Sequence, residues 1–169
     1  MLPQTRTSLK DEKLSRYFKI LKIVLFCMPF LCVGYLGLGA GGAALDTAGI
    51  LNANPAMAVS FLAAMLQPYA AWIAILAERR LADGRTNYAI MNLALLMVSE
   101  ILLMSTVGVI GMALILWKSV RTYGCGIPAA FLGCGVRDFF REAGGNLPLL
   151  ALAALCLFAS MRLGIGVSF

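Results

Sequence analysis

The chain contains no histidine and only eight acidic residues among its 169 positions. The absence of histidine removes the commonest general base and metal ligand of enzymes. No apolar segment carries a pair of carboxylates, and none of the five cysteines forms a C-x-x-C motif. Phosphate-binding loops and nucleic-acid-binding modules are absent as well. The sequence therefore predicts a protein that is not an enzyme, holds no metal or cofactor and binds no nucleic acid.

Charged residues are scarce, at 13% of the chain, whereas 61% of the residues are hydrophobic. In an ordinary soluble domain about 25% of the residues are charged. A water-soluble core of this size cannot bury so large an apolar excess. The composition therefore predicts an all-α integral membrane protein, a small polytopic helical bundle that has membrane lipids as partners.

Long apolar segments predict how the chain is divided. Four of them indicate four transmembrane helices within a single domain over 23–169, at about 23–45, 56–77, 88–117 and 147–169. Each has the roughly 17–25 residues, or more, that a bilayer crossing needs. The first segment is longer than the roughly 7–15 apolar residues of a cleaved signal peptide, so we expect it to be retained. Glu78, Arg79 and Arg80 are expected to end the second helix.

The placement of basic residues predicts the orientation. Residues 1–22 form a basic tail with six of the fourteen Lys and Arg residues: Arg6, Lys10, Lys13, Arg16, Lys19 and Lys22. The connection between the first two spans has no base, whereas Arg79, Arg80 and Arg85 occupy the next one. Because cytoplasmic loops are rich in Lys and Arg, a cytoplasmic N-terminus is predicted. Short connections favour a multi-pass protein of a bacterial inner (cell) membrane.

The run 88–117 can be interpreted in two ways. As one helix its thirty residues would be about 45 Å long, and Lys118 and Arg121 would then lie outside. A break between Ser105 and Gly108 would return these bases to the cytoplasm, but each arm would have about 15 residues, fewer than the ~17–25 of a full span. We favour one helix and four crossings. The alternative has five or six elements.

Glu100 is the only ionisable residue inside this run. A charge at the bilayer centre costs about 2.5–3.5 kcal/mol on insertion scales, so the carboxyl group should face protein or water, find a donor or be protonated. It lies beside a seam of polar residues that recur every seven positions: Asn92, Ser99 and Thr106. Three hypotheses follow. Glu100 is a proton or cation site in a transport path, a partner for a base of another subunit, or a protonated group hydrogen-bonded between helices.

Small side chains mark candidate packing faces. In the second span they recur at helical steps together with Gln67: Ser60, Ala64 and Ala71. In the first span Gly37 and Gly41 form a G-x-x-x-G motif. Small residues at such spacings let helix backbones approach closely. Both faces are predicted to pack against another helix, either within this bundle or in a partner.

Three local features complete the prediction. Pro68 follows Gln67 inside the second span and predicts a kink or hinge, since proline removes a backbone donor. The charged and aromatic stretch 136–143 predicts a short interfacial helix. Cys125 and Cys134 are the one cysteine pair with a plausible redox role, which requires their loop to lie outside the cytoplasm.

These features favour a non-enzymatic subunit of a larger membrane complex, such as a transport, secretion or channel assembly, that docks through its small-residue helix faces. Other integral membrane subunits, or further copies of the chain, are its expected partners. One alternative is a self-contained small transporter or ligand-binding membrane protein with a proton- or cation-linked Glu100. Another is a membrane thiol-redox protein that uses Cys125 and Cys134.

Overall fold

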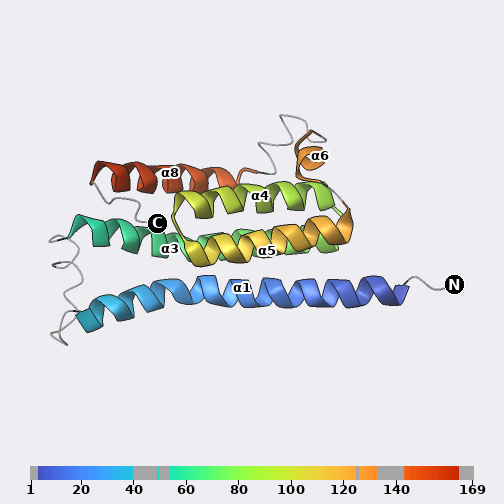
Figure 1. Cartoon of the computed structure of the whole chain (residues 1–169), viewed down its shortest axis with the longest axis horizontal. Helices are drawn as coiled ribbons and strands as arrows, with labels where there is room; N and C mark the ends of the chain where they lie inside the picture. Colours follow the sequence, from blue (N-terminus) through green and yellow to red (C-terminus); the bar gives the residue numbers. More distant parts are fainter. Residues whose placement is uncertain (1–3, 40–48, 50–53, 125, 133–142, 164–169) are drawn as a thin grey trace.

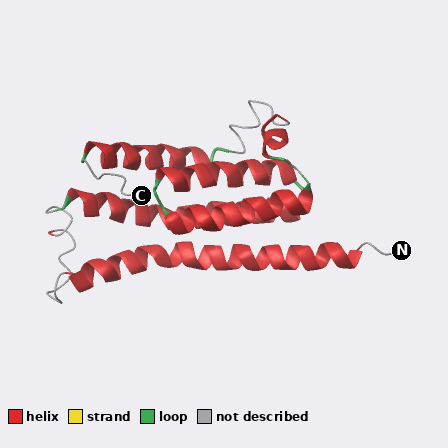
Figure 2. Cartoon of the chain, viewed as in Figure 1, coloured by secondary structure: helices red, strands yellow, loops and turns green. Residues whose placement is uncertain are grey.

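All regular structure in the described part of the chain is helical, as Figure 2 shows. The computed structural model describes residues 4–39, 49, 54–124, 126–132 and 143–163. Its helices are α1 (Gln4–Gly39), α3 (Pro55–Ala82), α4 (Thr86–Leu102), α5 (Thr106–Tyr123), α6 (Ile127–Leu132) and α8 (Asn146–Arg162). The predicted all-α class is confirmed for these residues.

The five long helices run in alternating directions along a common axis (Figure 1). Helix α1 packs against α3 and α5, and α3 also packs against α4 and α8. Helix α4 contacts α3, α5, α6 and α8, so it lies at the centre of the bundle. A side chain that points inward from α4 is therefore surrounded by protein.

Helix α1 has one buried and one exposed apolar face. Leu14, Phe18, Leu21 and Leu25 are buried, and their steps of four and three place them on one side of the helix. Large apolar side chains that are more than half exposed cover the other side: Ile20, Ile23, Phe26, Phe30, Leu31 and Tyr35. Soluble monomers seldom expose contiguous apolar patches of this kind.

Two of the described helical segments are long and apolar enough to cross a membrane. They are Lys13–Tyr35, within α1, and Pro55–Ala82, which is α3. Helices α4 and α8 are apolar as well but have 17 residues each. Exposed apolar side chains also cover the outer faces of α5 and α8, among them Ile110, Leu114, Leu155 and Phe158.

Helix α3 begins at a strong cap and ends later than predicted. The side chain of Asn54 accepts hydrogen bonds from the backbone nitrogens of Ala56 and Met57, and Pro55 occupies the first turn. The expectation that Glu78, Arg79 and Arg80 end the helix is wrong, because α3 continues through them to Ala82. Glutamate and arginine are good helix formers, so a charged group by itself does not stop a helix.

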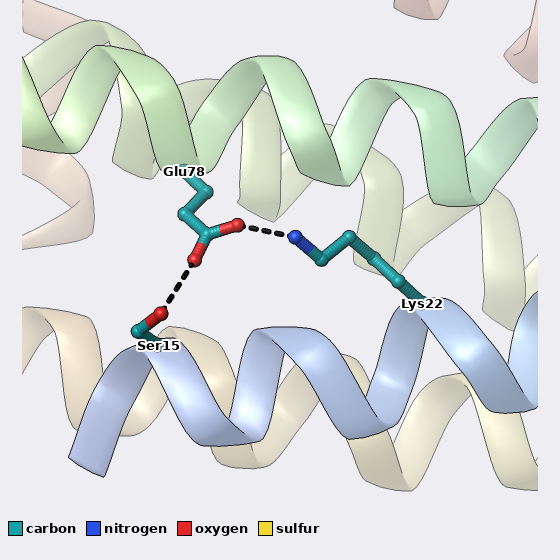
Figure 3. A network of polar contacts seen from close by, with 3 residues as sticks. All are labelled: Ser15, Lys22 and Glu78. Carbon is teal, nitrogen blue, oxygen red and sulfur yellow. Dashed lines mark hydrogen bonds and ion pairs between the residues drawn. The ribbon is translucent and has the colours of Figure 1, made fainter. Parts of the chain in front are cut away.

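Glu78 instead joins α3 to α1. As Figure 3 shows, its two carboxylate oxygens accept from Ser15 Oγ at 3.1 Å and from Lys22 Nζ at 2.5 Å. The acidic Glu78 and the basic Lys22 are thus used for a contact between two helices. The pair fixes the position of α1 along α3.

The run 88–117 is divided between α4 and α5. The favoured single helix over this run is wrong, because α4 ends at Leu102 and α5 begins at Thr106. Met104 has a positive φ of 54°, and Ser105 caps α5 by accepting a hydrogen bond from the Gly108 nitrogen at 3.2 Å. The two helices pack against each other. The alternative with a break close to Ser105 is the one that the structure confirms.

This hairpin brings basic residues to one end of the bundle. The connection from α3 to α4, which carries Arg85, and the last turns of α5, which carry Lys118 and Arg121, lie at the same end (Figure 1). The Nζ of Lys118 lies 4.3 Å from the centre of the Tyr17 ring of α1. The end of α5 is therefore beside the N-terminal half of α1.

Several predicted features lie outside the described residues. These are Gly41, Cys125, Cys134, the part 136–142 of the interfacial helix and the part 164–169 of the last span. The predicted last span corresponds to α8, which extends from Asn146 to Arg162.

Candidate functional site

Glu100 forms a buried polar pair with Gln67. It lies in the last turn of α4, its side chain is completely buried, and its Oε2 accepts a hydrogen bond from Gln67 Nε2 at 3.0 Å. Gln67 comes from α3 and is 3% exposed. The hydrogen-bond partner of the Glu100 carboxyl group is therefore an amide of the same chain.

The turn between α4 and α5 shapes the other side of this pair. At Gly108, in the first turn of α5, an added Cβ would lie 2.6 Å from Cδ of Glu100 and closer still to Oε2. Real Cβ atoms do not approach other atoms so closely, so only glycine leaves room for the carboxyl group there. The N-terminal turn of a helix carries partial positive charge, which favours a negative group beside it. Burial has the opposite effect, because it disfavours the charged form of the carboxyl group.

Two oxygens of this cluster lack donors. Neither Oε1 of Glu100 nor Oε1 of Gln67 has a hydrogen-bond partner among the residues that the structure describes. An unsatisfied buried acceptor costs about 1–3 kcal/mol. The cluster can therefore take up a proton or a hydrogen-bond donor from outside these residues.

An open cavity adjoins the pair. Its volume is about 290 Å³, and it lies between α3, the α4–α5 turn, α8 and Met28 of α1. Small or polar side chains form much of its wall: Ser60, Ala63, Ala64, Gln67, Ser105 and Ser160. Gln67 belongs both to this wall and to the Glu100 pair, so it connects the cavity to the buried carboxyl group.

The other residues of the predicted polar seam are placed separately. Asn92 accepts from Asn146 of α8 at 2.7 Å and donates to the Tyr88 carbonyl, whereas Ser99 donates to the carbonyl of Leu95 in its own helix. Thr106 is the first residue of α5 and is exposed. The structure thus joins Glu100 to Gln67 but not to Asn92 or Thr106.

The small-residue face of α3 has two parts. Ser60 and Ala64 line the cavity, whereas Ala71 is buried in the core. Pro68 lies within α3, which is helical on both sides of it, and it lines a groove against Lys22 and Phe26 of α1. Gly37 belongs to α1.

Three residues that take part in these buried contacts were not among the predicted site residues: Gly108, Ser105 and Asn146. The first two lie at the alternative break in the run 88–117, where the sequence has a serine that can cap a helix and a glycine three residues later. Asn146 follows two glycines at the start of a predicted span, where an asparagine is usually interpreted as part of a turn. Nothing in the sequence links it to Asn92.

The chemistry of the site is that of a buried carboxylic acid, an amide and hydroxyl groups beside an open cavity. Within the described ranges, no three His, Cys, Asp or Glu side chains lie together in a way that would hold a metal ion. Comparisons of the chain with family models, with curated proteins and with solved structures gave no match.

Proposed function

We propose that the chain is a multi-pass protein of the cell membrane with a cytoplasmic N-terminus and five crossings, by α1, α3, α4, α5 and α8. The outward apolar side chains of these helices support contact with lipid. The basic residues gathered at one end support the orientation, because bases are enriched on the cytoplasmic side. Helices of 17 and 18 residues are at the short end of the ~17–25 that span a bilayer.

Within this membrane we propose that the chain is a non-enzymatic subunit of a larger assembly. The observation that carries the proposal is the 290 Å³ cavity beside Ser60, Ala64 and Gln67. Its wall combines small side chains with a buried amide oxygen that has no donor among the described residues. Lipid chains fill space but donate no hydrogen bond. A protein partner fits this wall better than lipid does.

The proposed occupant is a transmembrane helix of another subunit. Small residues on that helix would allow close approach to Ser60 and Ala64, and a hydroxyl or amide group on it would donate to Gln67 Oε1. Hydrogen bonds between helices in membranes contribute about 0.6–2 kcal/mol each, so most of the affinity would come from packing. The expected partner is thus rich in Gly, Ala, Ser or Thr at the contact.

Affinity purification in mild detergent tests this proposal when it is combined with a filled cavity. The variant Ala64→Phe should lower the recovery of a stoichiometric partner by roughly tenfold, by analogy with other overpacked contacts. Ala154→Phe, on the exposed side of α8, is the matched control and should leave recovery unchanged. A cysteine at Ser60 should crosslink to the same partner. Recovery of a homogeneous homo-oligomer, or equal effects of the two Phe variants, would contradict the proposal.

A second candidate function is a small transporter linked to protons or cations. The observation that favours it is the buried Glu100 carboxyl group, which has one oxygen on Gln67 and one without a donor in the described part of the chain. Glu100→Gln distinguishes the two functions, since it keeps the shape but cannot ionise. A transporter variant should lose ion flux in proteoliposomes, whereas a subunit variant should retain its partner.

A further inference from the structure

We propose that a second cavity, at the basic end of the bundle, binds the headgroup of a phospholipid that carries both a phosphate and a hydrogen-bond donor. This cavity has a volume of about 180 Å³ and lies between α3, α4 and the start of α8. It is far larger than the roughly 10–15 Å³ that one water molecule requires. Its wall includes Arg80, Asn92 and Asn146.

Positive charge in this wall would bind the phosphate. The planar guanidinium of Arg80 has five N–H donors, so it can bind phosphate oxygens and still keep a contact within the protein. Helix α8 begins at the same place, with Gly145 and Asn146 in the wall. The partial positive charge of a helix N-terminus favours anions. No acidic side chain is among the described residues that line this cavity.

Asn146 supplies an independent observation that points to a ligand. Its side chain is 1% exposed, and its Nδ2 is oriented by hydrogen bonds to Oδ1 and to the backbone oxygen of Asn92. Its Oδ1 has no partner in the part of the chain that the structure describes. A buried acceptor of this kind needs a donor. The ligand must therefore bring a donor as well as an anion.

This pair of requirements selects among headgroups. Phosphoethanolamine has an ammonium group and phosphoglycerol has hydroxyl groups, whereas the quaternary ammonium of phosphocholine has no N–H to donate. Trp72 is half exposed at the rim, and apolar side chains of α3 continue the wall beside it. Tryptophan is typical of the membrane–water interface, where glycerol and acyl groups begin. The inference rests on the proposed membrane placement but not on the partner helix.

Native mass spectrometry of the full chain in detergent tests the inference, with equal amounts of dioleoyl phosphatidylethanolamine, phosphatidylglycerol and phosphatidylcholine. The first two should form more adducts than the third. Arg80→Gln should reduce these adducts about tenfold, as expected for loss of a charge-assisted hydrogen bond. Arg79→Gln removes the same charge from the exposed neighbouring position, so its adducts should change less than about twofold. Asn146→Ala should abolish the preference over phosphatidylcholine.

Each contrary outcome has a separate meaning. Equal losses in the two arginine variants would show unspecific attraction and overturn the site. Equal binding of all three lipids to the unchanged chain would overturn the role of Asn146, and this comparison does not depend on whether Asn146→Ala folds. Displacement of the lipids by inorganic phosphate would show that the cavity takes free phosphate instead. Because no partner is present, failure of the docking proposal leaves these results unaffected.

Discussion

At Glu100 three neighbours of different kinds surround one carboxyl group. Gln67 donates a hydrogen bond to it, the first turn of α5 adds positive partial charge, and Gly108 leaves it space. The first contact comes from Gln67 of α3, which precedes Glu100 by 33 residues. The acid is thus held by packing between α3, α4 and α5, and a single substitution in any of these three helices can disturb it.

Gly108→Ala tests the space requirement. The added methyl group would overlap the carboxyl group of Glu100, so we expect a loss of about 1–3 kcal/mol in the free energy of unfolding. Unfolding in detergent, followed by helical circular dichroism, measures it. Gly34→Ala in α1 is the control, since its Cβ would meet nothing within 4 Å. That variant should be neutral or stabilising, because alanine is the better helix former.

The residues of the site could be predicted only in part. Glu100, Gln67 and Asn92 were identifiable because polar groups in apolar segments are rare. Their pairing was not, since a helical wheel orders residues within one helix and cannot show which helix faces it. Asn92 accordingly pairs with Asn146 rather than with residues seven positions away.

At the scale of elements, the helix boundaries were less predictable than the helices. When only apolar residues are counted, each of the two arms of the 88–117 run is shorter than a full membrane span. Helix α4 starts at Thr86, and α5 continues through Lys118 and Arg121 to Tyr123, so both are longer than the apolar arms. Helix α3 exceeds its apolar segment for the same reason. Backbone hydrogen bonding continues into polar sequence wherever the residues are helix formers.

Met104→Gly tests the hairpin between α4 and α5. A left-handed backbone costs a non-glycine residue about 1–3 kcal/mol, so glycine should raise the free energy of unfolding by up to about 1 kcal/mol. Met65→Gly in α3 is the matched control, because the two methionines are 45% and 43% exposed. It should destabilise by about 1 kcal/mol. Similar losses in both variants would indicate that residue 104 lies in a continuous helix.

Glu78→Gln tests the link between α1 and α3. Its ion pair with Lys22 is partly buried, with side-chain exposures of 25% and 21%. We expect a loss of roughly 1 kcal/mol that shrinks as salt is added. Asp83→Asn, at an exposed position beyond α3, should change stability by less than about 0.5 kcal/mol. A salt-independent effect of Glu78→Gln would argue against the ion pair.

At the scale of the whole molecule, antiparallel packing determines which loops lie at the same end of the bundle. The hairpin places the α3–α4 connection and the end of α5 together, and the α4–α5 turn opposite them (Figure 1). With a cytoplasmic N-terminus, the turn at Met104 would face outward. A single helix over 88–117 would instead separate residues 83 and 121.

Single cysteines in a cysteine-free background test this arrangement. An impermeant thiol reagent added to intact cells should label Met104→Cys but neither Asp83→Cys nor Arg121→Cys. Labelling of both inner positions after the membrane is opened is the control for reactivity. If Arg121→Cys were labelled from outside while Asp83→Cys was protected, the five-crossing arrangement would be wrong.

The length of helix α1 has a consequence for the proposed membrane placement. Its 36 residues extend about 54 Å, and a hydrocarbon core takes up about 30 Å of that length. If α1 crosses a membrane as proposed, close to half of this helix extends beyond the acyl chains, at one or both faces. The basic first turns would then form a helical extension into the headgroup layer and the cytosol. In that placement, a protein that binds this end would contact a helix rich in Lys and Arg at a distance from the bilayer set by the length of α1.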